Sequence, residues 1–257
     1  MNALAGIGRL TLAACATTGG VLIFGLEAIA RGLRGPWYPR ELALQMVRIG
    51  YFSLPVVGLT AVFTGMVLAL QSYVGFTRFE APQAIPTIVV LSMTRELGPV
   101  LAGLMVAGRV GAAMAAEIGT MRVTEQIDAL TTLATDPLRY LVFPRLLAGV
   151  LMLPLLVLVA DVIGVLGGYL VSVYKLGFGP IEYLTRTLDH LESQDIISGL
   201  VKAAVFGFVI ALMGCYQGYR SEGGAEGVGA ATTRAVVTAS ILVLTLDYGL
   251  TEVFFAR

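Results

Sequence analysis

Charged residues are scarce in this sequence. They make up 13% of its 257 residues, and 57% of the residues are hydrophobic, whereas a soluble domain carries about 25% charged residues. The 17 basic and 17 acidic residues cancel, so no net charge attracts nucleic acid. These shortages exclude an ordinary soluble domain and give no support to nucleic acid as a partner.

Residues that usually carry chemistry are also few. Cys15 and Cys215 lie far apart and form no CxxC or zinc spacing, which disfavours a disulfide framework or a metal site. His190 is the only histidine, and no serine or cysteine nucleophile is marked near it. The stretch Gly223–Gly229 lacks the lysine of a phosphate-binding loop, because two alanines follow it. We therefore expect no enzyme activity, no metal site, and no cofactor or nucleotide site in this chain.

Long apolar runs dominate what is present. A run of about 18 or more apolar residues is long enough to cross the hydrocarbon core of a bilayer. Five such runs cover residues 50–74, 84–118, 141–174, 196–219 and 233–255. The expected fold class is therefore an all-α polytopic membrane protein with about five transmembrane helices, forming a single domain over residues 1–257.

The beginning of the chain is less apolar and is followed by basic and aromatic residues such as Arg31 and Trp37. That mixture is typical of a helix lying at the membrane surface. We expect an N-terminal interfacial or elbow helix within residues 1–45, followed by the transmembrane bundle over residues 46–257. A helix that spans the membrane over residues 10–30 is the competing interpretation.

Arginine and lysine residues are divided unequally between the two sides of the predicted bundle. If the N-terminus is cytoplasmic, most of them fall on the cytoplasmic side, as the positive-inside rule requires. Five crossings then place the C-terminus on the outer side of the membrane. We expect this orientation.

A short polar segment, residues 117–136, joins the second and third apolar runs on the cytoplasmic side. Thr124 is suited to be an N-cap, and Glu125 and Asp128 fall in the first turn, where the helix dipole favours anions. A TDP triplet then ends the segment, because the residue before a proline avoids helical angles. The pattern predicts a short, capped helix at the cytoplasmic surface.

On the outer side, residues 180–194 place Ile181, Leu184, Leu188 and Leu191 on one helical face. This spacing predicts an amphipathic helix at the outer interface. Packing against lipid headgroups is the simpler role for such a helix, and a surface for a partner protein is the alternative.

Small residues recur every four positions in the second run, at Gly103, Ala107, Gly111, Ala115 and Gly119. Such a stripe lets another helix approach closely, since small side chains bring backbones together in lipid. It predicts tight helix packing and carries no chemistry.

Arg95 and Glu96 lie inside the second apolar run, although a charge at mid-bilayer costs ~2.5–3.5 kcal/mol on insertion scales. At 1.5 Å per residue, Arg95 lies ~16 Å from the outer surface and Asp247 lies ~21 Å from the inner one. Asp161 occupies the upper part of the third run. All fall in the outer half, so we expect Arg95 to pair with Asp161 or Asp247. Glu96 points about 100° away from Arg95 and is expected to face a polar cavity or a ligand headgroup. A buried ion pair that only fixes helix register is the alternative.

Several stretches together carry a resemblance to a known family. They are MTRELGPVLAGLMVAGRVGAAMAAEIGTMRVTEQIDAL, then DPLRYLVFPRLLAG, and near the C-terminus CYQGY, GGAEGVGAATTRAVV and LDYGLT. In these blocks, from about residue 40 to 255, the sequence closely resembles the MlaE-type permeases.

The resemblance implies the membrane subunit of an ABC-type transporter in the inner membrane of a diderm bacterium, moving phospholipid between the inner and outer membranes. It implies a homodimer, in which each copy docks a cytoplasmic ATPase that binds the ATP and magnesium. A ring of MCE-domain protein is implied on the periplasmic side, with a small cytoplasmic STAS-domain subunit as a further candidate partner.

The resemblance also implies roles for particular residues. Those of the coupling segment that docks the ATPase are Glu117, Gly119, Thr124, Glu125, Asp128 and Leu130. Arg95 and Glu96 belong to the span that lines a lipid pocket at the dimer interface. The apolar walls expected for the acyl chains are Phe63, Leu70, Leu91 and Leu104.

Three other functions compete with this interpretation. A proton-coupled secondary carrier of lipids or small molecules would use Glu96, Asp161 and Asp247 as a relay, and inverted repeats would support it; we find none. A membrane enzyme acting on lipids would need a nucleophile with a nearby base. A structural scaffold would need no helix that transmits motion to a partner.

Overall fold

The computed structural model describes residues 3–79 and 82–255, and every regular element in those two ranges is helical. The α-helices in chain order are α1 (Ala3–Leu33), α2 (Pro39–Ile49), α3 (Leu54–Phe76), α4 (Ile85–Ser92), α5 (Gly98–Val106), α6 (Ala112–Val123), α7 (Gln126–Thr132), α8 (Phe143–Tyr174), α9 (Pro180–Asp189), α10 (Ser193–Tyr219) and α11 (Gly224–Phe255). The π-helical segments are Met93–Leu97, Ala107–Gly111 and Leu138–Val142. The short 3₁₀ turns are Tyr51–Ser53, Thr77–Phe79 and Pro82–Ala84.

Consecutive helices join into long apolar stretches. Those long and apolar enough to cross a membrane are Thr11–Leu33, Pro39–Phe76, Ile85–Val123, Leu138–Tyr174, Ser193–Tyr219 and Gly224–Phe255. The all-α fold expected from the sequence is therefore confirmed, and five of these stretches correspond to the five predicted runs. The last stretch begins near Gly224 rather than at residue 233. The chain turns at Gly223 and Gly224, which have positive φ angles, and the residues after them are already helical.

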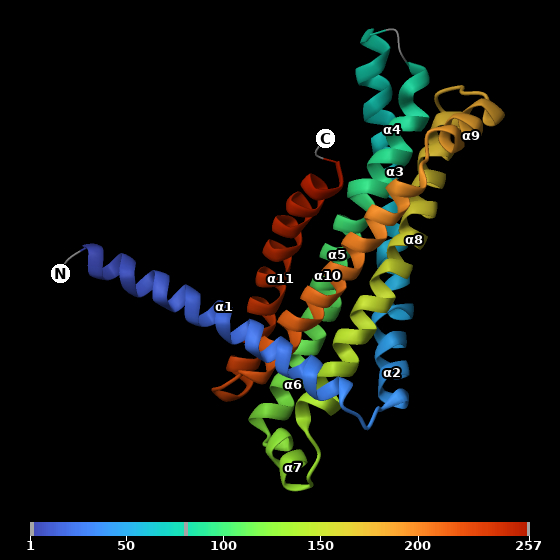
Figure 1. The fold of residues 1–257 in the computed structure, drawn as a ribbon. Coiled ribbons are helices and arrows are strands. Elements are labelled where there is room, and N and C mark those ends of the chain that lie inside the picture. The colour runs from blue at the N-terminus through green and yellow to red at the C-terminus, as the bar shows by residue number, and fades with distance from the viewer. Residues whose placement is uncertain (1–2, 80–81, 256–257) are drawn as a thin grey trace.

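The long helices form one elongated bundle (Figure 1). Within it α3 packs along α8, and α10 packs against α8, α6 and α11. The short helix α7 lies at one end of the bundle, and α9 and the start of α4 lie at the opposite end (Figure 1). These two ends are called the α7 end and the α9 end below.

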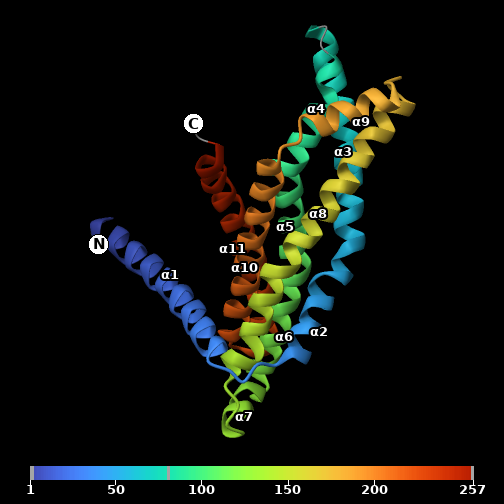
Figure 2. The same ribbon diagram turned by 45° about the vertical axis from the view of Figure 1, so that its right-hand side comes forward.

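The first half of helix α1 stands apart from the bundle, whereas its second half packs on α10, where the ring of Phe24 contacts that of Tyr216. The helix leaves the α7 end at an oblique angle in both views (Figure 1, Figure 2), and only 12% of its most apolar stretch is buried. Its last turn rests on α8, where Gly32 leaves no room for a side chain beside the ring of Phe143. The separation fits an elbow helix, and the length of Thr11–Leu33 also allows a crossing.

The predicted stripe of small residues is the surface on which α10 and α11 pack. A side chain at Gly103 would meet Phe206 and Val243, and one at Gly111 would meet Ile210. Glycine therefore permits the close approach of helices that the spacing predicted.

The predicted amphipathic helix is also present, as α9. Its Tyr183 and Thr187 are buried against the bundle, whereas Ile181, Leu184 and Leu188 are exposed. Three of the four predicted apolar residues thus face away from the bundle, whereas Leu191 lies beyond the end of α9 and is half-buried.

Candidate functional site

The backbone around Arg95 is irregular for a definable reason. Residues Met93–Leu97 form a π-helical segment, and Pro99 follows it within α5. Proline has no amide hydrogen to donate, so the carbonyl four residues earlier, that of Arg95, loses its helical partner. Single-turn π segments of this kind are frequent at functional sites.

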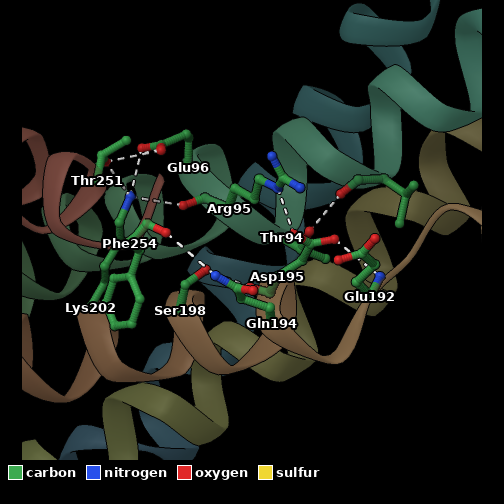
Figure 3. A network of polar contacts seen from close by, with 11 residues as sticks. Thr94, Arg95, Glu96, Glu192, Gln194, Asp195, Ser198, Lys202, Thr251 and Phe254 are labelled. Carbon is green, nitrogen blue, oxygen red and sulfur yellow. Dashed lines mark hydrogen bonds and ion pairs between the residues drawn. The ribbon is translucent and has the colours of Figure 1, made fainter. Parts of the chain in front are cut away.

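Lys202 of α10 donates a hydrogen bond to that free carbonyl. Its Nζ donates to the carbonyl oxygen of Arg95 at 3.0 Å, to Oε2 of Glu96 at 2.8 Å and to Oγ1 of Thr251 at 2.7 Å (Figure 3). It also forms an ion pair with Oδ1 of Asp247 at 3.0 Å. The side chain is fully buried, so this ammonium exchanges its hydration shell for four protein oxygens.

Arg95 pairs with Asp195, which corrects the expectation that its partner is Asp161 or Asp247. Its Nε donates to Oδ1 of Asp195 at 2.6 Å (Figure 3). Its guanidinium also lies 4.5 Å from the ring centre of Phe255. The other carboxylate oxygen of Asp195 accepts from the amide of Glu192 in a capping box at the start of α10. Asp195 is therefore held in place at the start of α10 by the capping box. Asp247 forms its ion pair with Lys202 instead.

This cluster, which we call the Arg95–Lys202 network, combines buried and accessible charges. Lys202 and Asp195 are buried, whereas the side chains of Arg95 and Glu96 are 35% and 38% exposed. Two cations face three carboxylates, those of Glu96, Asp195 and Asp247, which leaves one negative charge in excess. The two accessible side chains, one of each sign, are each anchored to a buried group of opposite charge.

Asp161 lies outside this network. Its carboxylate rests against the backbone of Gly98, where a β-carbon would collide with Oδ1. That oxygen is buried and has no hydrogen-bond partner within the described residues. Asp161 therefore sits behind the π-helical segment rather than on its accessible side.

The four apolar residues expected to line a lipid pocket lie along α3, α4 and α5. Phe63 is 57% exposed on the outer face of α3. Leu70, Leu91 and Leu104 are half-buried, and Leu104 packs against the hydrophobic core. Among the described residues, none of the four forms a polar or ring contact with the Arg95–Lys202 network. Their role as walls of a lipid pocket therefore stays a prediction.

Glu117, assigned above to the coupling segment, lies on α6 and joins three elements. Its carboxylate accepts from Arg48 of α2 at 2.8 Å and from Arg145 of α8 at 2.9 Å. Arg145 is nearly fully buried, and its Nη1 also donates to the carbonyl oxygen of Leu141 at 2.6 Å. Glu117 thus fixes α2 and α8 to α6 just above α7.

The short helix at the α7 end is confirmed, but its start differs from the prediction. Thr124 is not an N-cap: α6 continues to Val123, and the Thr124 hydroxyl donates to the carbonyl oxygen of Thr120 at 2.7 Å. Glu125 adopts a left-handed conformation with φ of 60° and precedes α7, which has no side-chain cap. Because Thr124 is the C-cap of α6, the chain turns one residue later than expected.

The two faces of α7 differ in burial, as the sequence predicted. Ile127 is buried and Leu130 is half-buried, whereas Glu125 and Asp128 are exposed. Asp128 pairs with Arg122 of α6 at 2.9 Å. Gly119, the remaining residue expected in the coupling segment, lets the turn after α10 approach α6, since a side chain there would press on Ser221 and Val228.

Three residues of the network were missed by the sequence analysis, namely Lys202, Asp195 and Thr251. Lys202 is a lone charge inside the apolar run 196–219, which marks a functional candidate in a membrane protein. Asp195 lies one residue before that run begins, where a charge is ordinary and gives no signal. Thr251 has no charge and gave no signal.

Comparison with known proteins gives concordant results. A family model described as Permease MlaE matches residues 42–253. A "Probable ABC transporter permease protein" of Rickettsia bellii is 58% identical over 99% of this chain and 98% of its own. The "Intermembrane phospholipid transport system permease protein MlaE" of Haemophilus influenzae is 41% identical over 83% of this chain and 82% of its own. The chloroplastic "Protein TRIGALACTOSYLDIACYLGLYCEROL 1" of Arabidopsis thaliana is 37% identical over 91% of this chain and 67% of its own.

Proposed function

This chain belongs to the MlaE permease family, as the multi-pass, non-catalytic membrane subunit of an ABC transporter, and on that premise we propose that its cargo is phospholipid. It moves this lipid between the inner and outer membranes of a diderm bacterium, driven by a separate cytoplasmic ATPase that binds the ATP and magnesium. The Haemophilus relative is named as an intermembrane phospholipid transport permease, which supports this cargo.

The observation that carries the proposal is the accessible side of the Arg95–Lys202 network. Only Nε of Arg95 donates to Asp195, and the two terminal nitrogens have no hydrogen-bond partner among the described residues. A guanidinium fork of this kind binds a phosphate through two parallel hydrogen bonds. The neighbouring Glu96 offers a negative charge to the amine of a zwitterionic headgroup. The acyl chains then lie on apolar walls that include Phe63, Leu70, Leu91 and Leu104.

The orientation proposed places the α7 end in the cytoplasm, with the N-terminus cytoplasmic and the C-terminus periplasmic. The arginines that gather near α7, such as Arg48, Arg122 and Arg145, support it through the positive-inside rule. In this orientation α7 docks the ATPase, using the exposed Glu125 and Asp128, and a STAS-domain subunit is a further partner on the same side. A second copy of the chain and a periplasmic MCE-domain ring complete the assembly.

The proposal is tested by isolating the tagged chain in mild detergent and identifying bound lipids and proteins together by mass spectrometry. We expect phospholipid, an ABC ATPase and an MCE-domain protein to co-purify with it. A lone, lipid-free chain that transports in vesicles under a proton gradient would instead establish the secondary carrier.

The role of α7 leads to a separate prediction. Replacing Asp128 with lysine reverses a charge on the proposed docking surface, so we expect ATP hydrolysis to continue while lipid transport falls by about tenfold, the effect of losing one charged contact. Both activities are measured in the reconstituted complex. Asp128 and Arg122 are exposed, so breaking their pair has little effect on folding. Asp128→Asn, which removes the pair without reversing the charge, is the matched control and should lose less. Full coupling in Asp128→Lys would show that α7 does not transmit the motion.

A further inference from the structure

A second polar site lies in the other half of the bundle. A groove of about 470 Å³ opens between α2 and α6, near the α7 end. Its charged lining comes from Arg48, Arg109 and Glu117, and its apolar lining includes Phe52 and Ala113. None of these residues belongs to the Arg95–Lys202 network.

Positive charge is in excess along this groove. Glu117 is shared between Arg48 and the buried Arg145, so one carboxylate serves two guanidinium groups. Arg109 has only neutral partners: Nη1 donates to Oγ of Ser53 at 2.9 Å and to the carbonyl oxygen of Arg48 at 3.3 Å. No acidic side chain of the described residues pairs with it. The two arginines of the lining, together with the buried Arg145 behind it, therefore have a single carboxylate between them.

The location of Arg109 makes this excess costly. It lies in the π-helical segment Ala107–Gly111 of a long apolar stretch, about 14 residues or roughly 21 Å before the end of α6 at Val123. Its side chain is exposed on the surface of the bundle. An unpaired arginine facing hydrocarbon costs about 2.5–3.5 kcal/mol on insertion scales, and an anion brought to it offsets that cost.

We propose that this groove binds the phosphate of an anionic phospholipid from the leaflet on the α7 side. Arg109 and Arg48 hold the phosphate, since guanidinium groups match its geometry, and the exposed ring of Phe52 borders the acyl chain. Basic pockets between membrane helices bind acidic headgroups in this way. The site requires only that the chain is embedded in a membrane, so it stands apart from the question of which cargo is transported. Free phosphate has the same charge chemistry but lacks the acyl chains.

The test uses the full-length chain in detergent micelles that contain equal amounts of phosphatidylglycerol and phosphatidylcholine with identical acyl chains. Retained lipid is counted by native mass spectrometry. We expect the wild type to retain phosphatidylglycerol preferentially and Arg109→Gln to retain about tenfold less, which corresponds to the loss of one charged hydrogen bond. Arg40→Gln removes the same charge from α2 outside the groove and should retain as much as the wild type.

A second variant tests the groove without changing its charge. Ala113→Phe places a ring in the groove, and we expect it also to retain less phosphatidylglycerol, even if Arg109→Gln fails to fold. Retention equal to wild type in Ala113→Phe would overturn the proposal, as would equal retention of the two lipids by the wild type. In a parallel arm, inorganic phosphate alone should not stabilise the chain against heat. Stabilisation as large as that given by phosphatidylglycerol would identify a phosphate site instead of a lipid site.

Discussion

Replacing Lys202 with methionine is expected to destabilise the folded protein by about 3–5 kcal/mol, the usual cost of removing one partner from a buried ion pair. The ammonium is fully buried and serves Glu96, Asp247 and the carbonyl of Arg95. Without it, the network has one cation against three carboxylates. The loss is measured as a lower unfolding temperature in detergent, followed by size-exclusion chromatography.

A second substitution separates the charge effect from a packing effect. If the loss arises from unpaired carboxylates, Lys202→Met combined with Asp247→Asn should recover part of the stability, because it restores the excess of one negative charge. Lys175→Met removes an exposed lysine just after α8 and is the matched control, with no change expected. A Lys202→Met protein as stable as the wild type would mean that the network contributes nothing to the fold.

The fold was largely predictable because hydropathy is a local property. A run such as 141–174 is apolar whatever its neighbours are, and it became α8 together with the π-helical turn before it. The end of α6 was less predictable. Whether Thr124 caps the next helix or completes the previous one depends on where the chain turns, and both uses of its hydroxyl are local and chemically similar.

The pairing within the site was not predictable from depth alone. Depth estimates placed Arg95 near Asp161 and Asp247, but the partner is Asp195, one hundred residues away at the start of α10. The π-helical segment changes which way Arg95 points, and the capping box fixes Asp195 independently. One signal was available: Pro99 frees the carbonyl of Arg95, and a free carbonyl in a membrane needs a donor. That donor is Lys202.

The second large effect is expected on transport. Replacing Arg95 with leucine and Glu96 with glutamine removes both accessible charges of the network, and lipid transport in the reconstituted complex should fall by about ten- to a hundredfold. This range corresponds to losing a charged contact worth about 1.5–3 kcal/mol. The measurement is the rate at which labelled phospholipid leaves donor vesicles when ATP is present.

Assembly should survive this double substitution, although the buried Asp195 loses its cation and the folded protein is expected to be less stable. One positive and one negative charge are removed, so the excess of one negative charge is unchanged, and Lys202 keeps its ion pair with Asp247. Asp195 keeps its capping contact with the amide of Glu192. The matched control removes the exposed Arg186–Glu182 pair of α9 by the same two replacements and should transport normally. If the Arg95 and Glu96 variant assembles and transports as fast as this control, the network holds helices together and does not bind the headgroup.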